Sequence, residues 1–436
     1  MDSNRPCPRP RIFYGWIVVA AAFIITCLGF GSAYTFSAFV DPLQQAFSAS
    51  RGSVSMVFSL AGGLYFGLGA ISGPLADRWG CRPLILIGMI LMGLGLILAG
   101  LARSLEEVYA AYGLGVGLGI GCSYVPALGA VQRWFVKRRG LASGLAVSGI
   151  GVGTLVMPPL ASLLIEAFGW RCAYVILGGF VIVLGAAMAA LLHGDPQVCG
   201  LKPDGAILRE DALSTVLTGT SVKEAIRSRS FIGLYAACLL CALGVFIPFV
   251  HLVPYALDHG VGQSSAVLLL GAIGIGSTAG RFLLGGLADR MGRGRSLMLM
   301  FFGMAFATAF WSISTGFFGL AAFALVYGVF YGGWVALLPA LVMDEFGGRH
   351  VSGIIGVLYT SVAVGTLIGP TAAGFVFDMY QSYMLPILAS VCANLVAGGI
   401  MVVTLRLSPK RNVEMESMLD TASVRRDGPD IAAGCN

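Results

Sequence analysis

Long apolar stretches alternate with short polar breaks along most of this 436-residue chain. A membrane-spanning helix needs about 20 mostly apolar residues, because the hydrocarbon layer is about 30 Å thick. Twelve stretches qualify: 13–40, 53–76, 83–102, 107–133, 140–168, 172–193, 230–258, 263–288, 296–315, 318–343, 350–378 and 383–406. The pattern therefore predicts an all-α membrane protein with twelve transmembrane helices.

The longest internal polar stretch, residues 194–229, divides these spans into two sets of six. We expect an N-terminal six-helix bundle over 1–193, a cytoplasmic linker over 194–229, a C-terminal six-helix bundle over 230–406 and a polar cytoplasmic tail over 407–436. Within the linker, Ser221 and Glu224 have the spacing of a capping box. A short surface helix starting there and a solvated linker with one helical turn both fit this pattern.

Composition and charge support this interpretation and give an orientation. The chain is 57% hydrophobic and 11% charged, whereas a soluble domain carries about 25% charged residues. If both termini are cytoplasmic, 23 of the 27 Lys and Arg residues lie on the cytoplasmic side, as the positive-inside rule requires. The opposite side receives only Arg51, Arg103 and Arg171. The short loops favour a multi-pass protein of a bacterial inner membrane.

The two halves repeat each other at an offset of 212 residues. Residues 73–80 (GPLADRWG) match residues 285–292 (GGLADRMG), and Gly-Thr-Leu at 153–155 recurs at 365–367. Two matches at one offset indicate a duplicated six-span unit. We expect two bundles related by a pseudo-two-fold axis, with a substrate site near the midplane where they meet.

Arg281 is the one Lys or Arg that lies well inside a predicted span, whereas all the others fall in loops, at helix ends or in tails. A guanidinium at membrane depth costs at least about 2.5 kcal/mol, and such a residue normally faces a cavity or a partner. No Asp or Glu lies well inside any predicted span to pair with it. Its five N–H donors match a carboxylate bidentately. The sequence therefore predicts that Arg281 binds an anion, although a structural pairing with backbone carbonyls would also satisfy it.

The repeated G-x-L-A-D-R-x-G motif resembles the cytoplasmic signature of the major facilitator superfamily. Residues 13–19 (FYGWIVV) and 134–144 (WFVKRRGLASG) resemble the monocarboxylate transporter branch, although oxalate/formate exchangers share much of this pattern. That branch has an arginine in the eighth span, and Arg281 stands at the corresponding place. The resemblance implies the twelve-helix fold of that superfamily, alternating access, and transport of lactate- or pyruvate-like anions with a proton.

Two departures from the branch affect the proton route. Its animal members have a lysine in the first span, where this chain has none over 31–36, and an aspartate one helical turn before the arginine, where this chain has Ser277. His251 is the only histidine that lies well inside a predicted span. It is our candidate for proton coupling, because histidine changes charge near neutral pH. A neutral histidine that only packs would look the same in the sequence.

Other residues complete the candidate site. Aromatic hydroxyls at mid-span need partners in lipid and therefore favour the interior. We expect four tyrosines to contact substrate: Tyr34, Tyr124, Tyr331 and Tyr359. We expect Leu28 to form part of an apolar wall. The resemblance to the superfamily implies gating roles for the two motif pairs, Asp77 with Arg78 and Asp289 with Arg290.

Three function classes remain open at this point. A proton-coupled symporter of small monocarboxylates fits a single fixed cation, and an organic-anion exchanger fits a cation that has no acid beside it. A non-transporting membrane sensor is disfavoured by the short loops. We find no nucleophile–base pair and no metal-ligand cluster, so we expect no enzyme, cofactor or metal. The expected partners are a monocarboxylate, a proton and the bilayer, with no nucleic acid, and we expect a monomer.

Overall fold

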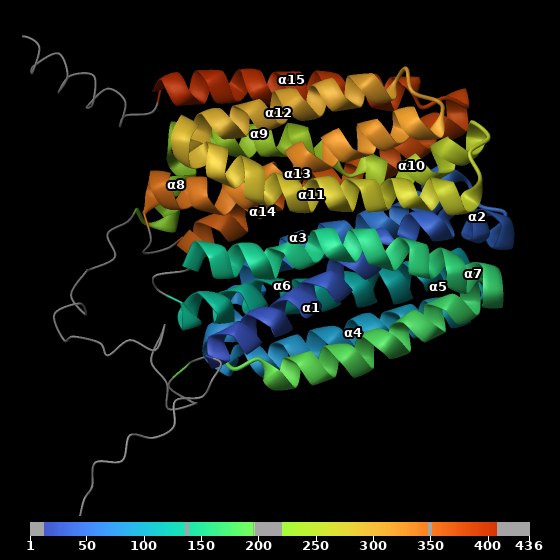
Figure 1. Ribbon diagram of the computed structural model, residues 1–436, viewed down its shortest axis with the longest axis horizontal. Helices are drawn as coiled ribbons and strands as arrows, with labels where there is room; N and C mark the ends of the chain where they lie inside the picture. The colour runs from blue at the N-terminus through green and yellow to red at the C-terminus, as the bar shows by residue number, and fades with distance from the viewer. Residues whose placement is uncertain (1–12, 136–138, 195, 197–219, 348–350, 408–436) are drawn as a thin grey trace, which may run out of the picture.

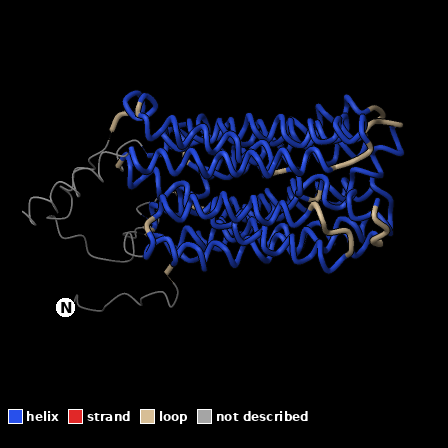
Figure 2. The backbone as a smooth tube through the Cα atoms, turned by 90° about the horizontal axis from the view of Figure 1, so that it is seen from above, coloured by secondary structure: helices blue, strands red, loops and turns tan. Residues whose placement is uncertain are grey.

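The computed structural model describes residues 13–135, 139–194, 196, 220–347 and 351–407. Over these ranges the chain is almost entirely helical (Figures 1 and 2). The first half contains α1 Tyr14–Tyr34, α2 Phe36–Phe47, α3 Arg51–Trp79, α4 Cys81–Leu101, α5 Leu105–Val108, the π-helical segment η1 Tyr109–Leu114, α6 Gly115–Trp134 and α7 Arg139–Leu191. The second half contains α8 Val222–Arg227, α9 Arg229–Val245, α10 Ile247–Asp258, α11 Gln263–Met291, α12 Arg293–Trp311, α13 Phe317–Phe346, α14 Val351–Tyr380 and α15 Met384–Leu407.

The number of membrane crossings agrees with the prediction of twelve. Eleven helical segments of the described chain are long and apolar enough to cross a membrane. One of them belongs to the 53-residue α7, which turns at Gly169 with φ 79° and ψ 161°. Since these dihedrals are not helical, α7 consists of two consecutive crossings. They correspond to the predicted spans 140–168 and 172–193.

The two halves form separate bundles that lie against each other. In Figure 1 the helices of the first half, blue to green, occupy the lower layer, and those of the second half, yellow to red, the upper layer. At the boundary α3 packs along α14 and α7 along α11. Helix α1 begins and α15 ends at the left of the view. We call this the terminal end, and the opposite end, which carries α2, α5 and α10, the far end.

The backbone itself repeats at the offset found in the sequence. Three pairs of positive-φ residues are 212 positions apart: Ser48 with Gly260, Gly80 with Gly292, and Gly169 with Gln381. A positive φ disfavours side chains with a Cβ, and four of these six residues are glycine. Equal turns at equal intervals support the duplication and the two-bundle fold.

The short helix expected at the capping box is present. The Glu224 backbone N–H donates to Ser221 Oγ at 3.3 Å, and the Ser221 backbone N–H donates to Glu224 Oε2 at 3.1 Å. Helix α8 follows directly. Of the two alternatives, the surface helix is therefore correct.

Candidate functional site

Arg281 lies in the third turn from the end of α11, buried between the two halves. Arg281 is 6% exposed, and its Nε, Nη1 and Nη2 atoms have no hydrogen-bond partner among the described residues. Buried polar groups are nearly always paired, because an unpaired donor keeps its full desolvation cost. Three free nitrogens on one guanidinium can donate hydrogen bonds to an anion.

The position of the guanidinium is set by close packing between α7 and α11. An added Cβ on Gly151 of α7 would lie 3.2 Å from Arg281 Nη1 and 2.9 Å from the Gly274 carbonyl oxygen of α11. Small residues at such crossings let helix backbones approach closely in membranes. The first half thus supplies the surface against which the arginine of the second half rests.

Three tyrosines from both halves lie within electrostatic range of the guanidinium. Tyr34 of α1, Tyr124 of α6 and Tyr331 of α13 all interact with Arg281 electrostatically. The hydroxyl groups of Tyr34 and Tyr331 are 3.0 Å apart and form a hydrogen bond that joins the halves. Tyr34 also stacks on Phe249 of α10, with ring centroids 4.4 Å apart. These phenols can donate to a bound anion or accept from the guanidinium.

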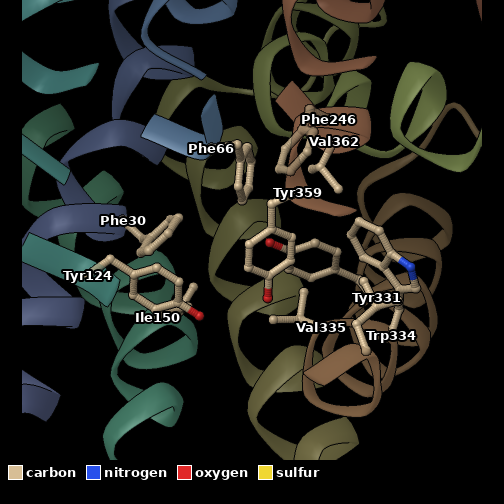
Figure 3. A pocket seen from close by; sticks show the side chains of 11 residues that line it. Phe30, Phe66, Tyr124, Ile150, Phe246, Tyr331, Trp334, Val335, Tyr359 and Val362 are labelled. Carbon is tan, nitrogen blue, oxygen red and sulfur yellow. The ribbon is translucent and has the colours of Figure 1, made fainter. Parts of the chain in front are cut away.

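A cavity opens beside this cluster (Figure 3). Its volume is about 20 Å³, roughly the space that one water needs and far below the roughly 300–1,000 Å³ typical of open small-molecule sites. In the figure the hydroxyl groups of Tyr124, Tyr331 and Tyr359 face the space between the rings. The lining residues are Phe30, Phe66, Tyr124, Ile150, Phe246, Tyr331, Trp334, Val335, Leu338, Tyr359 and Val362.

The structure brings together only part of the predicted substrate site. Tyr124, Tyr331 and Tyr359 line the cavity. Tyr34 lies behind the wall, bonded to Tyr331, and Leu28 is buried in α1 away from the lining. Arg281 does not line the cavity itself. It lies near Tyr124 and Tyr331, which do.

Sequence reasoning missed the apolar part of the wall. Phe30, Phe66 and Phe246 are ordinary span residues in the sequence, and no charge or motif marks them. The sequence offered one signal, Pro248, which stands two residues after Phe246. In the structure the helix is interrupted at Phe246, between α9 and α10.

A second cluster, which we call the far-end lock, joins the halves around Arg51. This residue was expected in a loop; instead it begins α3 and is 9% exposed. Its Nη1 and Nη2 donate to Asp258 Oδ2 and Oδ1 at 2.5 and 2.8 Å. Its guanidinium carbon lies 4.3 Å from the centre of the Phe377 ring. The bidentate pair connects α3 of the first half to the end of α10 in the second.

A second carboxylate strengthens the same junction. Asp378 of α14 accepts from the backbone N–H groups of Arg51 and Gly52 at 2.9 and 2.8 Å. These are the first N–H groups of α3, which lack partners within the helix. A negative charge is favourable at a helix N-terminus. The far end is therefore closed by an ion pair and a helix cap, both between halves.

His251 belongs to this lock rather than to the cavity. It is fully buried in α10, with Nε2 2.8 Å from the Pro370 carbonyl oxygen and Nδ1 3.0 Å from the Tyr383 hydroxyl. The carbonyl can only accept, so Nε2 carries a proton and Nδ1 accepts from Tyr383. The same hydroxyl accepts from Arg51 Nη1 at 3.1 Å. A neutral His251 satisfies both contacts, and it lies one hydroxyl away from Arg51.

The structure describes only one of the four predicted gating side chains. The side chains of Asp77, Arg78 and Asp289 lie outside those that the structure describes, and Arg290 is exposed at the end of α11. Their roles remain predictions.

Comparison with known proteins agrees with the fold. The family model described as the Major Facilitator Superfamily matches residues 21–370. Monocarboxylate transporter 12-B of Danio rerio is 32% identical over 393 residues, covering 85% of this chain and 82% of that protein. Monocarboxylate transporter 3 of Rattus norvegicus is 32% identical over 398 residues, covering 90% and 80%.

Among solved structures, a bacterial homologue of the human lysosomal transporter Spinster, in an inward-facing and unoccupied conformation, superposes with a TM-score of 0.69. It is 17% identical in sequence, and the match covers 91% of this chain and 98% of that one. At this identity the likeness concerns the fold alone.

Proposed function

Because this chain belongs to the major facilitator superfamily and within it to the monocarboxylate transporter family, we propose that it carries small monocarboxylates of the lactate and pyruvate type, with Arg281 as the carboxylate anchor. The observation that carries this proposal is the buried guanidinium with three unpaired nitrogens beside a cavity. A carboxylate would accept two parallel N–H bonds from it.

The charge inventory favours a monoanion. None of the cavity-lining residues is charged, and among the described residues no carboxylate pairs with Arg281. One bound carboxylate would neutralise one guanidinium. A dicarboxylate would bring a second charge into an apolar wall, and a buried unpaired charge costs several kcal/mol.

We propose that transport follows alternating access. The positive-inside pattern supports a cytoplasmic terminal end, which would make the far-end lock the closure of the outer side. Opening outward requires the Arg51–Asp258 pair and the Asp378 cap to separate, while the motif residues Asp77, Arg78, Asp289 and Arg290 would close the inner side.

His251 is our proposed site of proton coupling. If Nδ1 gains a proton, it can no longer accept from Tyr383, whose oxygen would then face N–H donors of two cations, His251 and Arg51. Their repulsion would weaken the lock. Protonation from outside would thereby favour the outward-open form, in which an anion can enter from outside.

Anion exchange is the second candidate, and one observation favours it specifically. An empty carrier would retain an uncompensated guanidinium, since Arg281 has no acid partner among the described residues. The empty carrier would then change slowly between its inward-facing and outward-facing forms, and the binding of a second anion would speed that change.

The test is uptake of labelled pyruvate into proteoliposomes, with and without an inward proton gradient. Symport predicts uptake that rises with the gradient, whereas exchange predicts uptake driven by preloaded anion and indifferent to pH. Arg281→Lys should lower uptake at least tenfold, because a lysine cannot form the bidentate pair. The matched control is Arg171→Lys, a change at an exposed arginine. Near-normal uptake by Arg281→Lys would exclude this anchor.

A further inference from the structure

The cavity beside Arg281 has room for a single small particle. Its volume is about 20 Å³, and a cavity needs about 10–15 Å³ to hold one water. A lactate-sized anion has several times as many heavy atoms as a water and does not fit this space. In this form of the protein the cavity therefore suits a water or a monatomic ion, and its walls must move apart before a monocarboxylate can enter.

The cavity and the guanidinium are neighbours. Ile150 lines the cavity, and a Cβ added to the next residue, Gly151, would lie 3.2 Å from Arg281 Nη1. Tyr124 and Tyr331 line the cavity and also interact with Arg281 electrostatically. No lining residue is charged. An ion in the cavity would therefore experience the positive charge of Arg281 without competition from a nearer group on the wall.

The polar atoms on the wall favour an anion. Figure 3 shows the hydroxyl groups of Tyr124, Tyr331 and Tyr359 facing the space, and each O–H can donate one hydrogen bond. The Tyr331 hydroxyl lies 3.0 Å from that of Tyr34, and when Tyr34 donates in this pair, Tyr331 keeps its own proton for a guest. A water would use these donors and acceptors but would leave the buried charge of Arg281 uncompensated, which is costly.

We propose that this cavity is a halide site, in which one chloride ion lies between the phenol hydroxyls and the guanidinium of Arg281. The inference goes beyond the proposed transport, because its ligand is inorganic, and shares with it only the anion-binding role of Arg281. The ion neutralises the guanidinium while the walls are closed. A monocarboxylate must displace it, so chloride and substrate compete for the same cation.

The test is thermal unfolding of the purified full chain in sodium chloride and in sodium isethionate, a bulky sulfonate of the same charge, at equal ionic strength. A ligand that binds only the folded protein raises the Tm as its concentration rises. We expect chloride to raise the Tm by about 2 °C, and Arg281→Gln to abolish this rise. The matched control Arg171→Gln, at an exposed arginine, should keep it. No rise in the native chain, or an equal rise in Arg281→Gln, would overturn the halide site.

A pair of tyrosine variants tests the wall of the site and decides the question if Arg281→Gln fails to fold. Tyr124→Phe removes a hydroxyl that faces the cavity. Tyr174→Phe removes a buried hydroxyl that does not line it. The chloride concentration that gives half of the Tm rise should increase about tenfold in Tyr124→Phe, as expected for a lost hydrogen bond to a charged group, and stay unchanged in Tyr174→Phe. Equal chloride responses in the two variants would refute this placement of the ion.

Pyruvate separates this inference from the proposed function. In saturating pyruvate, chloride should raise the Tm no further, because both anions need Arg281, and fully additive rises would overturn the shared site. A chloride response without any pyruvate response or monocarboxylate uptake would refute the proposed function and support the halide site. A pyruvate response without a chloride response would overturn the halide site and leave the proposed function standing.

Discussion

The far-end lock gives the sharpest quantitative prediction, through the change Asp258→Asn. This variant keeps the size of the side chain and removes the charge that pairs with Arg51. The Arg51 side chain is 11% exposed and that of Asp258 34%. Exposed pairs contribute about 0–1 kcal/mol, and breaking a fully buried pair costs about 3–5 kcal/mol. We therefore expect a loss of about 2 kcal/mol for this partly buried pair.

That loss falls on one side of the conformational equilibrium. The pair joins α3 to α10 and exists only while the far end is closed, so its loss destabilises the closed form selectively. Since 1.4 kcal/mol is a factor of ten, about 2 kcal/mol corresponds to a roughly 30-fold rise in the ratio of open to closed form.

The assay is thiol labelling at Ser59→Cys with a membrane-impermeant reagent, quantified at that one peptide by mass spectrometry. Ser59 lies on α3 two turns beyond Arg51 and is fully buried. When opening and closing are fast relative to labelling, the labelling rate follows the population of the open form. We expect Asp258→Asn to raise the rate about 30-fold.

The matched control is Asp344→Asn. Asp344 accepts from Arg293 at 2.6 Å, and both residues lie in the second half. This change removes an ion pair within the second half, away from the far-end lock. Equal labelling in all variants, or an equal rise in the control, would refute the idea that the Arg51–Asp258 pair holds the far end closed.

Three further predictions concern packing, pH and the linker helix. Gly151→Ala should lower the free energy of unfolding by about 1–3 kcal/mol through overpacking, because the added Cβ would press on Thr278. In thermal unfolding its Tm should lie below that of Gly144→Ala, where no atom lies within 4 Å of an added Cβ. His251→Gln should flatten the pH dependence of uptake, and an unaltered profile would remove His251 from the coupling scheme. The Ser221 backbone N–H lowers the pKa of Glu224, so its cap stabilises α8 above the ordinary carboxyl pKa and is lost as the pH falls through the lowered value. The protection of amides 222–227 against hydrogen exchange, taken relative to the intrinsic exchange rate at each pH, should fall on acidification in the native chain and lose this pH response in Glu224→Gln.

Features that depend on nearby residues were predictable from the chain alone. The twelve crossings follow from the lengths of apolar stretches, because a bilayer of fixed thickness requires them. The capping box at Ser221 needs only residues three apart, and the duplication needs only an offset. Arg281 was also visible, since a single charge in an apolar span is costly wherever the other helices lie.

The tertiary structure alone decided which side chains meet. Tyr34 and Tyr124 look equivalent in the sequence, yet the rotation of their helices puts one behind the wall and the other in the cavity. Arg51 and Asp258 are 207 positions apart. Each looks like an ordinary loop or helix-end charge, because hydropathy reports only how deep a residue lies. The packing of the two halves sets the angle and register between their helices, and only that packing turns an unremarkable Arg–Asp pair into a lock.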